Sequence, residues 1–479
     1  MNHPDDYARL LARRAFLGRT SLGIGSLAAA TLMQRDADAA KKTPVGDTGL
    51  AGLPHFAAKA KRVIFLCMAG GPSHLETFDY KPELAKMHGK PMPDSYTAGQ
   101  PIAQLQGKKL KCQGPLTKFK PYGKSGQMIS DFLPYHGKMA DELCIIRSMV
   151  TEQINHDPAH TFMNTGTAIS GRPSMGSWVT YGLGSESENL PGFVVMTSVG
   201  GRNPQPIASR QWSTGFLPSR YQGVEFNSRG NAVNYIGNPA GVSAAGQREL
   251  VDAVSALDRH RNKTVVNPEI DTRIAAYEMA AKMQTSVPEL VDFSDEPKKV
   301  LEMYGAKPGD GSYASNCLLA RRLAERGVRF IQLYHRGWDH HGGLVRYMNT
   351  CCRLTDKPTW ALLTDLKERG MLDDTLIIWG GEFGRTPMFQ GKGGAGRDHH
   401  IKGFSMWMAG GGVKSGTTYG ATDDLGYHSV ENIVHVRDLH ATMLHCLGIN
   451  HDRFSVKFQG LDMRLSGVEG AKVVKGVLA

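Results

Sequence analysis

The chain has 479 residues, of which 41% are hydrophobic and 21% charged, and its formal net charge is +11. This is globular composition, with room for one large domain or for one domain with a sizeable insertion. The basic residues are scattered and form no continuous stripe with stacking aromatics. We therefore expect no nucleic-acid partner, and a basic surface that favours anionic substrates.

Residues 1–39 have the pattern of an export signal. The paired arginines Arg13-Arg14, followed by Phe16-Leu17, precede a weakly apolar stretch, and Ala37-Asp38-Ala39 offers small residues at cleavage-site spacing. Paired arginines here are typical of the twin-arginine route. A membrane anchor is the alternative, but the apolar stretch contains glycines and is too short to span a bilayer comfortably. We therefore expect a twin-arginine signal peptide, the twin-arginine translocase as partner during export, a periplasmic or extracellular location, and no stable transmembrane segment.

The remaining residues, 40–479, predict a single domain in which strands alternate with helices. Continuous apolar runs predict buried strands at 62–68, 143–147, 192–196, 328–334, 375–379 and 404–409. Helical spacing predicts helices at 127–141, 156–167, 174–182, 272–284, 313–326, 344–369 and 436–447. Such alternation indicates an α/β fold with a mostly parallel sheet and helices on both faces.

Two segments lack this pattern. Residues 81–125 are rich in proline, glycine and lysine and predict a long irregular excursion. Residues 200–265 are rich in glycine, asparagine and serine with weak periodicity, so we expect an irregular insertion near the mouth of the site.

The seven cysteines give no sign of a cross-linked framework. Their number is odd, they are widely scattered, and no C-x-x-C motif occurs. We therefore expect no disulfide framework and no thiolate zinc site.

Histidines and carboxylates gather close after the predicted strands, with one further cluster in the following loop. Loops that leave the carboxyl ends of parallel strands meet at one crevice, so side chains distant in sequence can come together there. A single histidine of this kind is usually capped or exposed, but five clusters together favour a metal site. Imidazole with carboxylate suits zinc, manganese or iron better than calcium or magnesium, so we expect a divalent cation, zinc first and calcium least favoured. The candidate ligands are His74, Glu76, His156, Asp339, His341, Glu382, His399 and His400.

Several longer motifs resemble those of a known exported family. They are Gly70-Gly71-Pro72-Ser73-His74, Arg172-Pro173-Ser174-Met175-Gly176-Ser177-Trp178, Gly337-Trp338-Asp339-His340-His341, Gly381-Glu382-Phe383-Gly384-Arg385-Thr386-Pro387 and Gly396-Arg397-Asp398-His399-His400. With the twin-arginine signal, they resemble the family called domain of unknown function 1501. That family is similar to the alkaline phosphatase and sulfatase superfamily. The resemblance implies a three-layer α/β/α sandwich of the alkaline phosphatase type, and cleavage of phosphate or sulfate esters at one or two metals.

The resemblance also implies roles for individual residues. Asp339 and His341 match the superfamily's ligands after a middle strand, and His399 or His400 matches its late histidine ligand. Glu382 can replace an aspartate ligand of the second metal. Phe383 cannot replace the histidine beside it, so this resemblance leaves the second metal site incomplete.

This sequence differs most from the superfamily pattern at the position of the nucleophile. His156-x-Pro158-Ala-His160 occupies the place of the sulfatase Cys (or Ser)-x-Pro-Ser-Arg, so formylglycine chemistry is not expected. Attack by a metal-bound water comes first among the alternatives, then direct attack by His156, then by Thr161. Arg385 and Arg172 suit an anionic ester, because guanidinium matches phosphate or sulfate in a bidentate fork.

These patterns predict an exported metal-dependent hydrolase of phosphate or sulfate esters, with an anionic small molecule or polysaccharide ester as substrate. The alternative is a catalytically inactive exported binding or scaffold protein with the same fold, favoured by the missing Ser, Thr or Cys nucleophile. A metal-dependent isomerase or mutase, which would move a phosphoryl group without releasing phosphate, is a third possibility.

Overall fold

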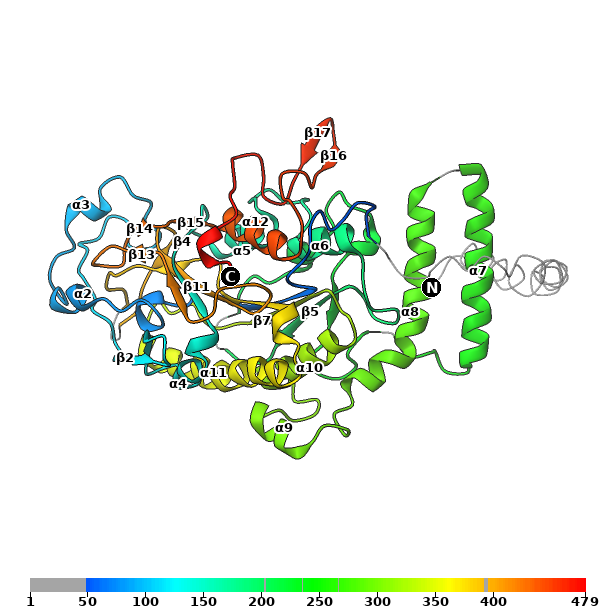
Figure 1. The fold of residues 1–479 in the computed structure, drawn as a ribbon, viewed down its shortest axis with the longest axis horizontal. Helices are drawn as coiled ribbons and strands as arrows, with labels where there is room; N and C mark the ends of the chain where they lie inside the picture. Colours follow the sequence, from blue (N-terminus) through cyan, green and yellow to red (C-terminus); the bar gives the residue numbers. More distant parts are fainter. Residues whose placement is uncertain (1–48, 202–203, 235, 266, 392–394) are drawn as a thin grey trace, which may run out of the picture. The chain divides into compact units, whose positions relative to one another are not determined.

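The computed structural model describes residues 49–201, 204–234, 236–265, 267–391 and 395–479. The predicted signal peptide at 1–39 lies outside these residues. The described residues are built around a nine-stranded sheet with helices on both of its faces (Figure 1).

The sheet is mostly parallel, as predicted. Its strand order is β12-β4-β11-β8-β1-β7-β5-β6, and β15 also pairs with β4. The neighbours β8, β1, β7, β5 and β6 run parallel, whereas β11 is antiparallel to both β8 and β4. The strands are β1 (Arg62–Met68), β4 (Cys144–Val150), β5 (Phe193–Ser198), β6 (Val224–Phe226), β7 (Phe330–His335), β8 (Thr375–Gly380), β11 (Phe404–Ala409), β12 (Thr417–Tyr419) and β15 (Val434–His435).

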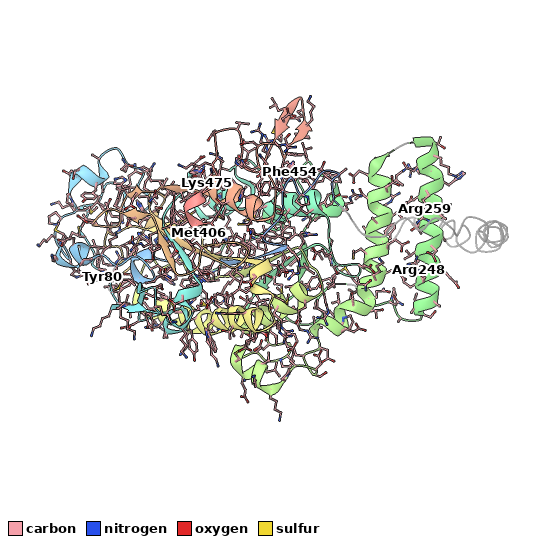
Figure 2. All side chains as sticks on the ribbon, in the orientation of Figure 1. Tyr80, Arg248, Arg259, Met406, Phe454 and Lys475 are labelled. Atoms are coloured by element: carbon pink, nitrogen blue, oxygen red, sulfur yellow. The ribbon has the colours of Figure 1, made fainter. Side chains whose placement is uncertain are left out.

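Side chains of the central strands alternate between two hydrophobic cores. In β1, Ile64 and Leu66 belong to the core shared with α10 and α11, whereas Val63 and Phe65 belong to the core shared with α6 and α12. Both faces of the sheet are therefore covered, which makes the fold a three-layer α/β/α sandwich. Side chains fill the layers on both sides of the sheet (Figure 2). The main helices are α5 (His156–Thr165), α6 (Met175–Leu183), α8 (Pro268–Val291), α10 (Tyr313–Glu325), α11 (Leu344–Glu368) and α12 (Val436–Cys446).

Every predicted strand is confirmed, with ends shifted by at most a few residues, and most predicted helices are confirmed as well. The helix predicted at 127–141 is wrong. Residues Gln127–Ser130 form β3, which pairs with β2 (Phe119–Tyr122), and a short helix α4 (Pro134–Lys138) follows. Pro134 starts this helix, because proline is accepted in a first helical turn but would interrupt a helix continuing from residue 127.

We expected an irregular insertion over residues 200–265, but only its first part is irregular. Residues Ala244–Val265 form the 22-residue helix α7, which contacts α8. Arg248 of α7 bonds to Glu278 of α8 at 2.8 Å, and Arg273 of α8 bonds to Asp258 of α7 at 2.5 Å. Most α7 side chains are exposed, so its apolar stripe is too narrow to give a strong helical period in the sequence.

The smaller elements surround the edges of the sheet. Paired strands are β9 (Gly384–Arg385) with β10 (His399–His400), β13 (Ala421–Thr422) with β14 (Ser429–Glu431), and β16 (Val456–Phe458) with β17 (Leu461–Met463). Short helices are α2 (Pro82–Lys86), α3 (Asp94–Thr97) and α9 (Lys298–Tyr304). Among the residues described, none of the helices has the length and apolar character needed to cross a membrane. The seven cysteines are all buried and free.

Candidate metal centre

One edge of the sheet collects most of the predicted ligands. The carboxyl ends of β4, β8, β1 and β7 all lie at this edge, because these strands point the same way. His156 starts α5 after β4, Asp339 follows β7, and Glu382 follows β8. His399 lies just before β11, and since β11 is antiparallel to β8, its starting end reaches the same edge.

Two glycines allow the loops at this edge to come close together. Gly70 follows β1 with φ of +120°, and a Cβ there would lie 2.5 Å from the backbone nitrogen of Asp339. A Cβ on Gly396 would lie 2.1 Å from the carbonyl carbon of His341. Any larger residue at either place would push the ligand-bearing loops apart.

The first group of possible ligands contains His156, Asp339, His341 and His399, whose donor atoms all lie within 4.8 Å of one another. His341 Nε2 is 2.9 Å from Asp339 Oδ1 and 3.0 Å from His399 Nε2. His399 Nε2 is 3.4 Å from the same carboxylate oxygen. Two imidazole nitrogens and one carboxylate oxygen therefore face one another.

Partners outside the group fix the tautomers of these two imidazoles. His399 Nδ1 donates to the backbone oxygen of Ile154 at 2.7 Å, and His341 Nδ1 lies 2.7 Å from Oε1 of Gln390. The Gln390 amide nitrogen bonds to Gln104 Oε1, which directs its own oxygen toward His341. Both Nε2 atoms then carry lone pairs, and the amide nitrogen of Gln104, 3.2 Å from His341 Nε2, is a weak donor there. Two lone pairs and a carboxylate in contact repel one another unless a cation lies between them.

The second group contains His156, His160 and Glu382. His156 Nδ1 is 2.6 Å and His160 Nε2 is 3.4 Å from Glu382 Oε1. The backbone nitrogen of Gly70 donates to both oxygens of this carboxylate, at 3.0 and 3.1 Å. Neither ring nitrogen of the fully buried His160 has a hydrogen-bond partner among the described residues. Buried polar atoms without partners are rare, and a bound cation would satisfy such a nitrogen. His156 belongs to both groups.

Metals require ionised carboxylates and neutral imidazoles, and most of these side chains are held in that state. Burial alone would raise the pKa of Asp339, but its contacts with the surrounding histidines and the charge of Arg385 lower it well below its usual range. Burial likewise opposes ionisation of Glu382, yet the neighbouring histidines lower its pKa to about 2. Burial, only partly opposed by the contact with Asp339, lowers the pKa of His399 to about 4. His156 is the exception: burial works against its charged form, but its contacts with the two carboxylates raise its pKa, so this ring must lose a proton before it can bind a cation.

Two predicted histidine ligands lie outside both groups. His74 Nε2 is 2.9 Å from the backbone oxygen of Gly426, and His400 Nε2 is 2.5 Å from that of Tyr427. Both rings are buried and point to main-chain carbonyls. The structure does not bring them into contact with the other predicted ligands, because each is bonded elsewhere.

Glu76, the third predicted ligand outside the groups, forms a buried ion pair. Its two oxygens accept from Arg397 at 2.7 and 2.9 Å, and neither side chain is exposed. Asp398, the next residue, accepts from the backbone nitrogens of Leu105 and His399. Glu76 therefore anchors the loop that presents His399, and does not itself face the ligand groups.

Arg385 is also placed differently from the expectation that it contacts an ester. Its guanidinium is fully buried and donates to the backbone oxygens of Gly70, Gly71 and Arg397. It also donates to Asp339 Oδ1 at 2.7 Å. With its donors used in this way, Arg385 positions the carboxylate and is closed off from a substrate.

Thr161, the third candidate nucleophile, lies within α5. Its hydroxyl donates to the backbone oxygen of Asp157, one turn earlier, at 3.0 Å. Arg172, the other predicted anion contact, lies near the opposite end of α5, beside Gly166 and Thr167. Neither side chain belongs to the two ligand groups.

Two residues of the centre were missing from the predicted ligands and anion contacts. His160 could have been found from its spacing, because His156 and His160 are four residues apart and so share one face of a helix.

Arg210 lies beside the start of α5, where it donates to Asp157, and its side chain is 39% exposed. No sequence signal distinguishes this arginine, because it arrives from the insertion.

Phe383 lies between the rings of the two groups. It is buried, with its ring centre 4.6 Å from that of His399 and 5.0 Å from that of His156. Phe383 thus forms an apolar wall beside these rings, and His160 supplies a second imidazole near Glu382, at 3.4 Å, after His156 at 2.6 Å.

Together these features define an α/β/α protein with a histidine- and carboxylate-rich centre at the carboxyl edge of its sheet. Residues 60–478 match the family described as "Protein of unknown function (DUF1501)", and the chain belongs to that family. The resemblance predicted from the motifs is thereby confirmed. A search of the curated proteins finds no match.

Several solved structures are similar over most of the chain. The lipoteichoic acid synthase LtaP from Listeria monocytogenes has 10% identity, covering 89% of this chain and 79% of that chain, with a TM-score of 0.36. The PsFucS1 sulfatase from Pseudoalteromonas sp. has 12% identity, covering 88% and 72%, with a TM-score of 0.36. A TAB5 alkaline phosphatase mutant with bound Mg has 11% identity, covering 82% and 99%, with a TM-score of 0.30. At such low scores these proteins carry no argument about the site, which rests on its own geometry.

Proposed function

We propose that this protein is an exported metal-dependent hydrolase of phosphate or sulfate esters. The observation that carries the proposal is the meeting of two imidazole nitrogens that hold no proton, Nε2 of His341 and Nε2 of His399, with Oδ1 of Asp339. Imidazole and carboxylate donors together favour zinc, with manganese or iron next. The side chains of His156, Asp339 and His341 keep 15 to 23% of their area exposed, so a ligand can reach the centre.

A divalent cation held there would act as a Lewis acid toward the ester oxygen and lower the pKa of a water molecule. The chain's own residues favour water over a side chain as the nucleophile. His156 lies with Nδ1 2.6 Å from Glu382 and Nε2 3.3 Å from Asp339, and its contacts with these carboxylates raise its pKa, which favours the protonated ring over one that attacks phosphorus or sulfur. The Thr161 hydroxyl is bonded within its helix.

Recognition of an anionic ester is proposed to fall to Arg210. It contacts Asp157, the residue that follows His156 in the chain, and its side chain is 39% exposed and so open to a ligand. A guanidinium at this place can grip the non-reacting oxygens of a phosphate or sulfate group in a bidentate fork.

The location is part of the same proposal. The twin-arginine pattern in residues 1–39 supports transport of the folded protein by the twin-arginine translocase to the periplasm or beyond. Export in the folded state would allow the metal to be loaded before the chain leaves the cytoplasm.

The test uses full-length protein purified separately from cytoplasmic and exported fractions. Metal content and turnover of 4-nitrophenyl phosphate and sulfate are measured for the wild type, Asp339→Asn and the control His260→Gln, whose side chain is exposed on α7. We expect Asp339→Asn to lose its metal and at least about 100-fold in kcat/KM, while the control matches the wild type. Equal metal content in all three would refute the metal centre, and recovery of uncleaved protein from the cytoplasm alone would refute export.

A catalytically inactive exported binding protein is the second candidate. It is favoured by the burial of Arg385 and by the engaged polar atoms of His156 and Thr161. Wild-type protein that contains the metal but releases neither phosphate nor sulfate from these esters, while still binding them, would favour this alternative over the hydrolase.

A further inference from the structure

A hollow lies near the other end of α5 from His156. Its volume is about 170 Å³, and Thr165, Gly166 and Thr167 form part of its wall. At a rise of about 1.5 Å per residue, the length of α5 separates it from His156 by roughly 14 Å. The residues of the two ligand groups take no part in its lining. The hollow is thus a separate site.

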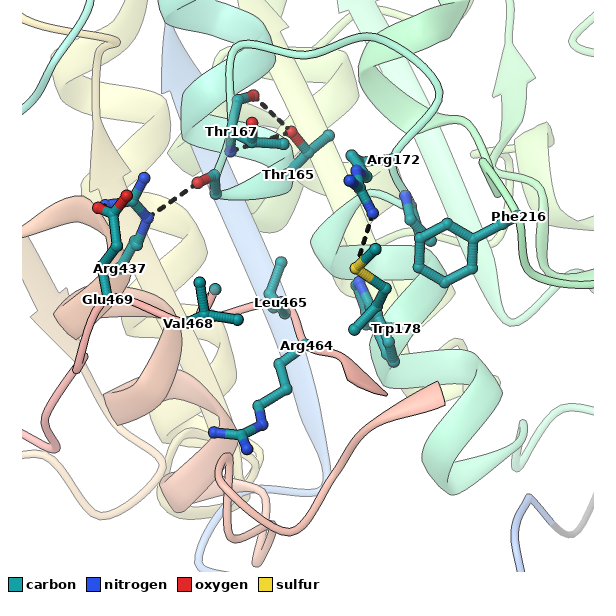
Figure 3. A pocket seen from close by; sticks show the side chains of 14 residues that line it. Thr165, Thr167, Arg172, Trp178, Phe216, Arg437, Arg464, Leu465, Val468 and Glu469 are labelled. Atoms are coloured by element: carbon teal, nitrogen blue, oxygen red, sulfur yellow. Dashed lines mark hydrogen bonds and ion pairs between the residues drawn. The ribbon is translucent and has the colours of Figure 1, made fainter. Parts of the chain in front are cut away.

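The wall of this hollow contains a motif that the metal centre does not use. Arg172, Pro173 and Trp178, from the Arg-Pro-Ser-Met-Gly-Ser-Trp motif, all line it (Figure 3). Hydrogen bonds hold the turn rigid: Ser174 Oγ is 3.0 Å from Ser177 Oγ, which in turn donates to a backbone oxygen at 3.1 Å. The arginine at the start of the motif is therefore held at the edge of the hollow by a fixed scaffold.

Three arginines and one glutamate give the hollow a positive lining. Figure 3 shows Arg172 and Arg437 on opposite sides, and Arg464 below them with its guanidinium directed away from Arg172. Arg437 is already neutralised, because it bonds to Glu152 at 2.6 Å and to Glu469 at 2.5 Å. The positive charge available to a ligand must come from the other two.

Arg172 and Arg464 keep unused capacity for an anion. Within the described part of the chain, Arg172 has no carboxylate within ion-pair distance; it lies against Met463 Sδ, a weak acceptor, and over the ring of Phe216 at 5.8 Å. Arg464 has one ion pair, to the exposed Asp452 at 3.2 Å, and its Nε is buried without a partner. A guanidinium stacked on an aromatic ring keeps its donor edge free for a bidentate oxyanion.

We propose that this hollow is a binding site for an oxyanion, a sulfate or phosphate group held by Arg172, toward which the side chain of Arg464 would turn. Each arginine would donate to separate oxygens of the anion, and the free Nε of Arg464 would gain an acceptor. The apolar side chains of Phe216 and Leu465 complete the lining and suit the carbon skeleton of a small sugar that carries the group. The metal centre lies about 14 Å away, judged by the length of α5. Binding at the hollow therefore needs neither the metal nor catalysis at that centre.

The test is calorimetric titration of the full-length protein with sodium sulfate at constant ionic strength. Arg172→Gln and Arg464→Gln should each weaken sulfate binding about tenfold, the effect of losing one charge-assisted contact. Arg248→Gln is the matched control, since this exposed arginine on α7 lies far from the hollow in sequence and already has carboxylate partners (Figure 2). Asp339→Asn removes the sulfate binding of the metal centre, so the binding that remains in this variant, and that Arg172→Gln weakens, belongs to the hollow.

Two results would overturn the site. One is sulfate binding unchanged in both Arg172→Gln and Arg464→Gln; the other is binding lost in Asp339→Asn, which would assign the anion to the metal centre. If Arg172→Gln fails to fold, Arg464→Gln still decides the question. Titration with glucose 6-sulfate and glucose 6-phosphate distinguishes the source: tighter binding than inorganic sulfate, reduced by Phe216→Ala, indicates a sugar ester, and equal binding indicates the free anion.

Discussion

His341 and His399 each have one ring nitrogen fixed by a partner outside the ligand groups. For His399 the partner is a backbone carbonyl, which no substitution can remove, but for His341 it is the side chain of Gln390. Outer contacts of this kind set the tautomer and aim the other nitrogen at the metal. The metal affinity should therefore depend on Gln390, although this residue belongs to neither group.

Replacing Gln390 by leucine, which has a similar volume but no acceptor, should lower metal affinity about 10- to 100-fold. The loss follows because the His341 ring becomes free to rotate and to place its proton on Nε2. Competition with a coloured chelator measures the affinity. Gln390→Glu, which keeps an acceptor oxygen, is the control and should retain tight binding; equal affinity in the leucine variant would show that His341 is not a ligand.

Residue types alone could not separate ligands from supporting groups. Glu76 and Glu382 both follow strands as predicted, yet one pairs with Arg397 and the other contacts two histidines. Arg385 has the chemistry of an anion receptor but is enclosed by backbone carbonyls. Which partner each charge meets is decided by loop packing, and the sequence holds no local signal for that.

Among the elements, α5 links the two proposed sites, and α12 packs against it. His440 of α12 donates from Nε2 to the backbone oxygen of Met163 in α5 at 2.7 Å. Its Nδ1 is buried without a hydrogen-bond partner among the described residues, and burial, the main cause, lowers its pKa to about 4. Protonation would place a charge between two helices where no acceptor is available.

This contact predicts a pH dependence of stability. The folded-state pKa of about 4 lies below the ordinary value of 6.5, so the neutral ring's contribution is fully present above pH 6.5 and is lost as the pH falls toward 4. The total loss is on the order of 3 kcal/mol. Urea unfolding at several pH values, with chelator present throughout, should show a smaller loss for His440→Gln than for the wild type. Identical pH profiles would contradict the prediction, and the exposed His260→Gln should behave as wild type.

The elements that could be predicted are the strands buried on both faces and the strongly amphipathic helices. The run Thr375–Gly380 is apolar throughout because helices cover both sides of β8, and that run is visible in the sequence. Helix α7 packs mainly against α8, so most of its surface is polar and its period is weak. The segment 127–141 is misleading for another reason: its helical spacing is broken at Pro134, and pairing with β2 fixes the first part as a strand.

For the whole molecule, the sheet order explains why ligands so distant in sequence meet. The segments after β4, β7 and β8 converge because these strands are parallel, and the single reversed neighbour β11 brings in the segment before it. The general position of the site could be predicted from this rule, but the reversal of β11 could not, because strand direction depends on pairing partners. A cation at this edge would join four chain segments at once.

Metal removal should therefore lower the stability of the entire fold. A ligand that binds only the native state stabilises it by about 4 kcal/mol when its free concentration is 1,000 times its Kd. Chelation should lower the melting temperature by several degrees, since about 1 kcal/mol corresponds to a few degrees in domains of moderate size. Scanning calorimetry of the wild type, with and without chelator and after restoring zinc, measures the shift. Asp339→Asn, which already lacks the carboxylate between the two imidazoles, should melt at the same temperature under all three conditions. A wild type that is equally insensitive would show that no cation ties these segments together.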